Sequence, residues 1–192
     1  GGAWAEGDRA MYRFVGTALA SAGFLTIIPD YRVFPEVRFP GFLEDAALAT
    51  RWAEANATML GGNPDKLVLM GHSAGAHIAA LLALDPRWLG GVGLSPGQLA
   101  GWVGLAGPYD FLPIKNPDVR PVFFWPDSPP QSQPINHVRR GAPPALLIAS
   151  SIGRVALTVM GKALIDDVIQ ALIPRPARTK TESEADLPER TS

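Results

Sequence analysis

The chain has 192 residues, of which 47% are hydrophobic, and its formal net charge is −1 at pH 7. This length and apolar content suit one domain with a core of its own. The near-neutral charge gives no reason to expect nucleic acid or an anionic membrane as a partner. There is no cysteine, which excludes a disulfide framework and a thiolate metal site. No apolar run approaches the roughly 18 residues of a membrane span.

The first third of the sequence predicts two helices with a strand between them. Asp8 can cap a helix that extends to about residue 22, where Gly23 ends it. The apolar run 24–28 predicts a strand, and a second helix is expected over 43–57. Apolar residues that we expect to face the core recur along both helices: Met11, Phe14, Val15, Ala18 and Leu19 in the first, and Leu43, Ala46, Ala47 and Trp52 in the second.

The centre of the chain predicts a strand, a sharp turn and a helix. Residues 66–70 (KLVLM) form a short apolar run typical of a buried parallel strand. Residues 71–75 match G-x-S-x-G with Ser73 at the middle, and the Ala- and Leu-rich run 76–84 predicts a helix. This order is the context in which the motif carries a nucleophilic serine. The alternative interpretation is a glycine–serine turn that matches by chance.

The chemistry of acyl transfer explains the spacing of the motif. A sharp turn holds Ser73 in a strained backbone conformation with its hydroxyl above the sheet, and Gly71 and Gly75 leave room for neighbouring segments. The amide of Ala74 then lies at the start of the helix. Unpaired N–H groups and the helix dipole favour a developing oxyanion there.

The second half of the chain predicts two more strands. Residues 85–99 read as a loop, and strands are expected at 100–105 and 143–149. Residues 116–134 are rich in proline and aromatic side chains, which is typical of a lid or a binding wall. Alternating strands and helices predict a mostly parallel sheet with helices on both faces. Ligands of such sheets bind at the carboxyl ends of the strands, where Ser73 lies.

The end of the chain predicts a helix and a tail. Residues 155–172 have helical apolar spacing, with Asp166 and Asp167 expected on the solvated face. Residues 174–192 are charged and lack aromatic side chains, so we expect them to be disordered. The domain limits that follow are 1–172 for a partial domain and 173–192 for the tail.

Several motifs occur in a combination that is typical of one family. Residues 1–8 look like an H-G-G-x-W…G-D loop without its His, and residues 30–46 are similar to a D-Y-R-L-x-P-E…F-P…x-E-D-A segment. Residues 71–77, 107–110, 134–138 and 142–148 match as well. Over residues 1–149 the chain resembles the α/β-hydrolase esterases of the hormone-sensitive-lipase and feruloyl-esterase-like type. Arylformamidases are similar too.

The resemblance implies an α/β-hydrolase fold, here incomplete, and hydrolysis of small carboxylic esters. The nucleophile would be Ser73, and the amides of Gly2, Ala3 and Ala74 would form the oxyanion hole. A loop without bulky side chains lets backbone N–H groups reach the substrate oxygen. The family uses no metal or organic cofactor, and the expected partner is a small-molecule ester. The sequence leaves the oligomeric state and the cell compartment open.

The resemblance ends after Ala149. Gly153 stands where the family has its acid, and no histidine follows His137, although the family places its catalytic histidine later in the chain. We expect His72 to point away from the pocket and His77 to be packed in its helix. His137 could line the pocket but is not the expected base.

The acid and base that would serve Ser73 are therefore not identified. Asp110 follows a strand, where a loop hydrogen bond is a simpler role than one in the site. One interpretation of residues 150–192 is an altered reading frame or a foreign junction.

Three hypotheses for the function follow from these observations. The first is an ester hydrolase that acts through an acyl-Ser73 intermediate, impaired in this chain because loss of one triad member typically lowers turnover about a million-fold. The second is a non-catalytic fragment that binds acyl ligands or nothing. The third is an N-formyl amide hydrolase. Trp4, Phe123 and Trp125 either set substrate preference or serve as packing residues.

Overall fold

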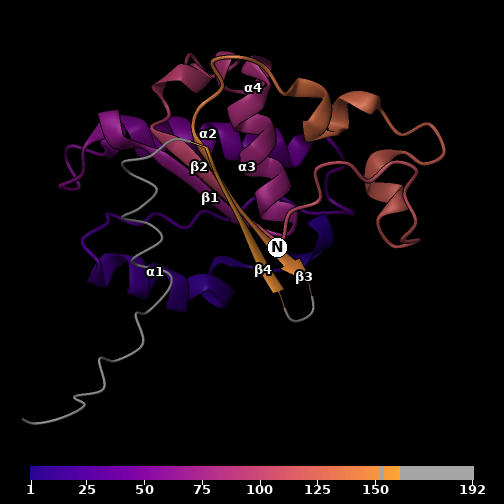
Figure 1. Cartoon of the computed structure of the whole chain (residues 1–192), viewed down its shortest axis with the longest axis horizontal. Helices are drawn as coiled ribbons and strands as arrows, with labels where there is room; N and C mark the ends of the chain where they lie inside the picture. The colour runs from indigo at the N-terminus through magenta and orange to yellow at the C-terminus, as the bar shows by residue number, and fades with distance from the viewer. Residues whose placement is uncertain (152–153, 161–192) are drawn as a thin grey trace, which may run out of the picture.

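The computed structural model describes residues 1–151 and 154–160, in which four strands form one sheet in the order β1-β2-β3-β4 (Figure 1). The first three strands run parallel, and β4 pairs with β3 in the antiparallel direction. Their bounds are β1 Val68–His72, β2 Gly101–Leu105, β3 Ala145–Ser151 and β4 Arg154–Met160. His72 aligns with Leu105, and Leu105 aligns with Ile148. The carboxyl ends of the three parallel strands therefore lie at one edge of the sheet, directly before Ser73.

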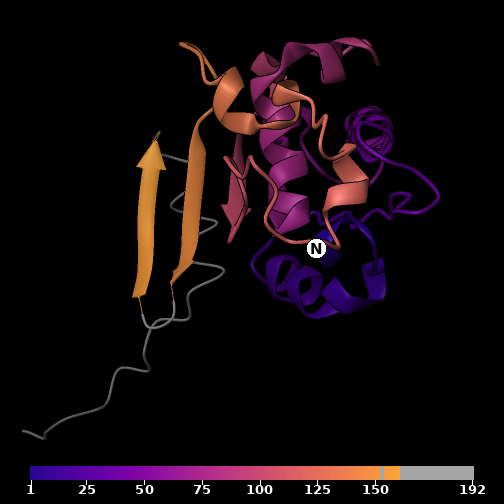
Figure 2. The same cartoon turned by 90° about the vertical axis from the view of Figure 1, so that its right-hand side faces the viewer.

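In the described part of the chain, the sheet is accompanied by four α-helices: α1 Arg13–Ser21, α2 Gly41–Asn56, α3 Ala74–Leu84 and α4 Pro86–Gly90. Helix α3 packs directly on β1 and β2, and α2 packs on α3. Figure 2 shows both helices on the same side of β3 and β4. Every residue of α3 except Gly75 is buried, which is the expected behaviour of a helix that is apolar all round.

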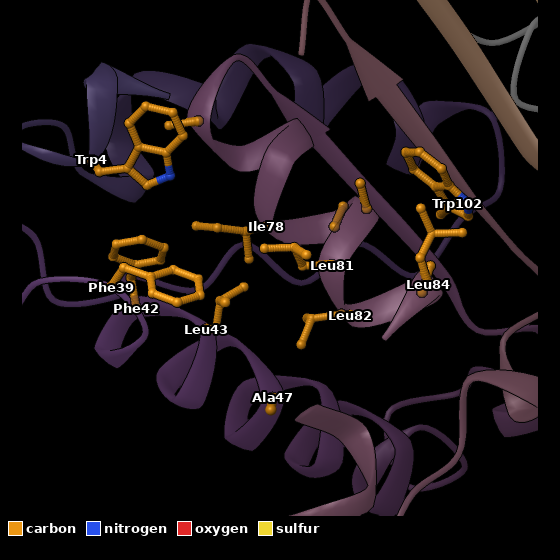
Figure 3. Packing of buried hydrophobic residues seen from close by; sticks show 14 of the residues in the cluster. Trp4, Phe39, Phe42, Leu43, Ala47, Ile78, Leu81, Leu82, Leu84 and Trp102 are labelled. Atoms are coloured by element: carbon orange, nitrogen blue, oxygen red, sulfur yellow. The ribbon is translucent and has the colours of Figure 1, made fainter. Parts of the chain in front are cut away.

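The core lies on both sides of α3. Figure 3 shows Ile78 and Leu82 on the side of α3 that faces Phe42 and Leu43 of α2, and Trp102 of β2 near Leu84 on the other side of α3. The side chains of Phe42, Leu43 and Leu81 have no exposed surface. Truncation of a fully buried leucine of this kind typically costs about 2–5 kcal/mol of stability. The helix that begins beside Ser73 is therefore fixed by packing over its whole length.

The first predicted helix is divided and more exposed than expected. Asp8 accepts hydrogen bonds from the amides of Ala10 and Met11, but the turn that it caps is a 3-10 helix, Arg9–Tyr12, which leads into α1. Leu19 is buried, whereas Met11 and Phe14 are 60% and 72% exposed. Ala18 is exposed as well and Val15 is half-buried, so Leu19 is the only buried residue of the expected core stripe.

The second predicted helix is present as α2, with one misassigned side chain. Leu43 and Ala47 are buried, as expected for its core face. Trp52 is 53% exposed and does not belong to that face. Residues 85–99, expected to be a loop, contain α4 and a 3-10 turn, Pro96–Gln98, capped by Ser95.

The strand expected at 24–28 is wrong. These residues form no ladder in the described part of the chain, although their exposure alternates as it would in a strand, with Leu25 44% and Ile27 37% exposed. A strand needs a hydrogen-bonded neighbour, and the described part of the chain supplies none beside this segment.

The helix expected over 155–172 is also wrong where the structure describes it, because residues 154–160 form β4. Val155, Thr158 and Val159 are β-branched and favour a strand, and the free edge of β3 offers backbone partners. Residues 161–172, with Asp166 and Asp167, and the tail 174–192 lie outside the described residues. Among the described residues, no helix combines the length and apolarity of a membrane span.

Candidate active site

Ser73 stands between the end of β1 and the first residue of α3. Its backbone angles are φ 54° and ψ −118°, a combination that a non-glycine residue adopts only when its surroundings force it. Here the surroundings are hydrogen bonds on both sides of the residue. The Ser73 amide donates to the Leu105 carbonyl at 2.8 Å, and the Ser73 carbonyl accepts from the amide of Ala76 at 2.9 Å. The half-buried serine is thereby tied to β2 as well as to its own helix.

The two glycines of the motif have different neighbours. A Cβ atom on Gly71 would overlap the Gly75 carbonyl and would lie 2.5 Å from the Ala76 nitrogen, so this turn has no space for a side chain. A Cβ atom on Gly75 would meet only the Gly1 nitrogen, at 3.7 Å, which is an ordinary contact. Gly75 therefore faces the N-terminal loop, while Gly71 closes the turn.

The N-terminal loop lies against the first turn of α3. Residues Gly2–Trp4 form a short 3-10 turn in which Gly2, Ala3 and Trp4 have φ values of 74°, 49° and 60°. The Gly2 carbonyl accepts from the amides of Ala5 and Glu6 at 2.9 and 3.0 Å. The structure thus brings the residues expected to form the oxyanion hole, Gly2 and Ala3 on one side and Ala74 on the other, to the same end of α3.

A second segment, residues 31–34, holds this loop from outside. The Tyr31 hydroxyl donates to the Gly1 carbonyl at 3.2 Å, and the Phe34 amide donates to the Trp4 carbonyl at 2.8 Å. Burial, with a smaller contribution from Tyr12, raises the pKa of Tyr31 to about 12. The sequence signal for this contact was the D-Y-R segment, but reasoning from the sequence did not assign Tyr31 a role.

Segment 31–34 is itself fastened to α2 through Asp45. The guanidinium of Arg32 forms a two-pronged hydrogen-bonded ion pair with the Asp45 carboxylate, and the Arg32 amide donates to the same carboxylate at 2.9 Å. The hydrogen bond from Arg32 lowers the pKa of Asp45, against the opposing effect of burial.

Trp4 leads from the loop into an aromatic cluster. Its indole is 4% exposed, stacks on Phe111 with centroids 5.7 Å apart, and meets Phe123 and His77 edge to face. Trp4 and Phe123 are thus core packing residues. Trp125 differs, because it is 47% exposed and lies under the guanidinium of Arg120 at 4.4 Å.

The three histidines have separate environments. His72 is exposed, with Nδ1 3.4 Å from the Tyr12 hydroxyl. His77 is fully buried, and its Nε2 lies 2.7 Å from the Ser132 carbonyl, so Nε2 carries the hydrogen and donates. Burial lowers the pKa of His77 to about 4, although the bond to Ser132 opposes the change. His77 is therefore a neutral hydrogen-bond donor at physiological pH.

His137 is not brought to Ser73. Its Nδ1 lies 3.6 Å from the carboxylate of Asp85, and its Nε2 lies 2.9 Å from the Gln131 carbonyl. Asp85 caps the far end of α3, whereas Ser73 precedes its first residue, and the 11 residues between them span about 16 Å. The expectation that His137 could line the pocket is therefore not met.

No described residue forms a hydrogen bond with the Ser73 hydroxyl, and Asp110 is exposed. Gly153, which stands where the resemblance places an acid, lies outside the described residues. Within residues 1–151 and 154–160 there is also no group of three His, Asp or Glu side chains that could hold a metal ion. The arrangement places Ser73 and the backbone amides of Gly2, Ala3 and Ala74 at the same end of α3, and the described part of the chain places no basic side chain in hydrogen-bond contact with Ser73.

The chain is similar to known esterases. The BD-FAE family matches residues 1–118. Esterase LipC of Mycobacterium tuberculosis is 32% identical over 169 residues, which are 79% of this chain and 42% of LipC. The isoprenylcysteine alpha-carbonyl methylesterase ICME of Arabidopsis thaliana is 35% identical over 118 residues, which are 59% of this chain and 28% of ICME.

Solved esterase structures are also similar. The apo form of Thermogutta terrifontis esterase 2 has a TM-score of 0.64 and 28% sequence identity, over 77% of this chain and 56% of that protein. The same enzyme has been solved phosphoramylated by tabun and with butyrate bound. These likenesses confirm the fold class that the sequence predicts. The chain spans less than half the length of LipC and ICME.

Proposed function

Since this chain belongs to the BD-FAE family of α/β-hydrolase esterases, we propose that it is a serine hydrolase of the carboxylesterase type, which cleaves small carboxylic esters through an acyl-Ser73 intermediate. The observation that carries the proposal is the placement of Ser73, in a strained conformation at the start of α3 and beside the Gly2–Trp4 loop. No other described serine combines a positive φ with a helix N-terminus.

The proposed reaction has two steps. The Ser73 oxygen attacks the ester carbonyl carbon, the bond to the alcohol breaks, and the alcohol leaves with the proton from Ser73. Water then attacks the acyl carbon, the bond to the Ser73 oxygen breaks, a proton of the water restores the Ser73 hydroxyl, and the acid is released. In both steps the carbonyl oxygen becomes negative, and the amides of Gly2, Ala3 and Ala74 are the donors proposed to stabilise it.

The relatives support an ester substrate, since LipC and ICME are named as an esterase and a methylesterase. A small acyl group is supported by Thermogutta terrifontis esterase 2, which has been solved with butyrate and with propionate bound. The buried aromatic side chains around Trp4 fill the space beside the first turns of α3, which favours short acyl chains over long ones.

The direct test is covalent labelling of the purified chain with a fluorophosphonate probe, located by peptide mass spectrometry. We expect slow labelling of Ser73, because none of the three histidines lies in a position to serve it, and loss of the label in Ser73→Ala. The matched control is Ser95→Ala, which removes a surface capping serine and should keep the label. Labelling that survives in Ser73→Ala, or that is found on another serine of the parent chain, would contradict the proposal.

A substrate panel separates the alternatives. p-Nitrophenyl acetate and butyrate report esterase turnover, and N-formylkynurenine reports amide cleavage. Turnover of the formamide alone would transfer the function to N-formyl amide hydrolysis. Binding of butyrate without labelling or turnover would support a non-catalytic acyl binder, a reading that the lack of a described base beside Ser73 favours.

A further inference from the structure

The two peptide units of the N-terminal loop are held by different kinds of group. The Gly2 carbonyl accepts two backbone amides, those of Ala5 and Glu6, and because a peptide unit is planar these bonds also fix the direction of the Ala3 amide. The Gly1 carbonyl accepts from a side chain, the Tyr31 hydroxyl at 3.2 Å. In a trans peptide the C=O and the next N–H point in opposite directions, so this bond sets the direction of the Gly2 amide.

The Gly1–Gly2 peptide unit needs such a restraint more than others do. Neither residue has a Cβ atom, so rotation of the plane meets little steric resistance. Gly2 also has a φ of 74°, and glycine adopts positive and negative φ values about equally readily, so this conformation is not fixed by the residue itself. An amide that rotates away from the substrate contributes nothing to a developing oxyanion, because such donors act through their fixed orientation.

We propose that Tyr31 is a positioning residue of the oxyanion loop, whose hydroxyl fixes the Gly1–Gly2 peptide plane and thereby aims the Gly2 amide at the substrate oxygen. This inference rests on the proposed function of the loop. Tyr31 touches neither Ser73 nor the reacting atoms in this role, and acts only through the Gly1 carbonyl.

The surroundings of Tyr31 allow its hydroxyl to be removed without loss of the fold. The backbone on either side is held independently, by the Asp45 carboxylate at Arg32 and by the Trp4 carbonyl at Phe34. The phenol is half-buried and remains protonated over the whole range in which the protein would be assayed, because its pKa is about 12. Tyr31→Phe therefore deletes one hydrogen bond and keeps the ring.

The chain supplies a matched control in Tyr12. Its hydroxyl lies near the same loop, since a Cβ atom on Gly1 would contact it, but it pairs with His72 Nδ1 at 3.4 Å and makes no hydrogen bond to the loop backbone. Tyr12→Phe removes a hydroxyl from the same neighbourhood while leaving the Gly1 carbonyl bonded. Any effect on the labelling rate that comes only from losing a hydroxyl near the loop should be the same in both variants.

The experiment compares two probes of one shape, a fluorophosphonate with P=O and its fluorothiophosphonate analogue with P=S. Sulfur is the weaker hydrogen-bond acceptor, so only the P=O probe gains much from the oxyanion hole. Removing a donor outright typically costs about 10²–10³ in rate. Tyr31→Phe leaves the donor present but unaimed, so we expect labelling of Ser73 by the P=O probe to slow about tenfold, and labelling by the P=S probe to change less than about twofold. Tyr12→Phe should leave both rates unchanged.

Equal slowing with both probes, or no slowing with either, would overturn the inference. If the parent chain reacts with neither probe, the proposed function fails for this chain, and the role of Tyr31 is then decided by nuclear magnetic resonance of glycine-labelled protein. Tyr31→Phe must shift the Gly2 amide signal and leave that of Gly141 unchanged. An unmoved Gly2 signal in a folded variant would refute the role of Tyr31 by itself.

Discussion

At Gly71 the turn before Ser73 has no room for a side chain, and this gives a prediction about the two glycines of the motif. Gly71→Ala would force a Cβ atom into the backbone of Gly75 and Ala76, so we expect a loss of about 3 kcal/mol or more. Gly75→Ala adds only an ordinary contact and gains helix propensity, so we expect a change within about 1 kcal/mol. Urea unfolding of both variants measures this, and equal effects would contradict the geometry.

The buried side chain of His77 makes the stability of the fold depend on pH. Its pKa falls from 6.5 to about 4 on folding, mainly through burial. Between these pH values the unfolded chain binds a proton at His77, and the folded chain does not. Stability is therefore complete above about pH 6.5 and declines as the pH falls toward about 4. Between about pH 7.5 and pH 5 the decline should be about 2 kcal/mol from this residue.

The check is urea unfolding at those two pH values in the parent and in His77→Gln. The variant should be less stable at the higher pH, because it loses the buried ring, but it should lose less stability on acidification than the parent does. His72→Gln is the control, since His72 is exposed, and it should keep the pH dependence of the parent. A parent whose stability is equal at both values would show that His77 is not held neutral.

At the scale of the elements, the ion pair between Arg32 and Asp45 joins segment 31–34 to α2. Asp45→Asn removes the charge that holds the Arg32 guanidinium and weakens the hydrogen bond from the Arg32 amide, so we expect a loss of about 1 kcal/mol, at the upper end for exposed pairs because several hydrogen bonds are affected. The control is Glu54→Gln, which breaks an exposed ion pair within α2 and should cost about 0.3–0.5 kcal/mol.

The measurement is again urea unfolding at neutral pH, extended to acid. Folding lowers the pKa of Asp45, so its contribution is present above about 3.8 and is lost as the pH falls through the lower folded value. The parent and Asp45→Asn should therefore approach each other in stability at the acid end. If Asp45→Asn and Glu54→Gln lower the free energy of unfolding by the same amount, segment 31–34 is held by other contacts.

The elements also show which parts of the fold could be predicted from sequence. The segment around Ser73 was predictable because its signals are local: an apolar run, a glycine-flanked serine and an Ala- and Leu-rich helix. The predictions of a strand at 24–28 and of a helix that includes 155–160 were wrong, because a strand forms only beside a hydrogen-bonded neighbour. No local sequence pattern reveals that neighbour. The contact between Tyr31 and Gly1 joins residues 30 positions apart, and spacing along the chain does not indicate it.

For the whole molecule we predict weak turnover. Ser73 at its ordinary pKa is a poor nucleophile without an adjacent base, and none of the three histidines lies in a position to serve it. Loss of one triad member typically lowers turnover about a million-fold, with about a thousand-fold over water remaining. Hydrolysis of p-nitrophenyl butyrate by the chain should therefore fall far below that of Thermogutta terrifontis esterase 2.

The comparison needs the Ser73→Ala variant beside it. Residual hydrolysis that is the same in parent and variant belongs to the solvent or to the surface of the protein. Turnover within about tenfold of the intact esterase, abolished by Ser73→Ala, would mean that a base reaches Ser73 and that the triad is complete.

The burial of Trp4 has an optical consequence. Its indole is shielded from water and belongs to the same loop as Gly2 and Ala3, whereas Trp52 and Trp125 are about half exposed. In a chain in which both exposed tryptophans are replaced by phenylalanine, the fluorescence emission comes from the buried Trp4 and Trp102 and the half-buried Trp88, of which only Trp4 belongs to the loop. Movement of the loop during substrate binding would then shift the emission to longer wavelengths and admit a soluble quencher, giving a signal in real time.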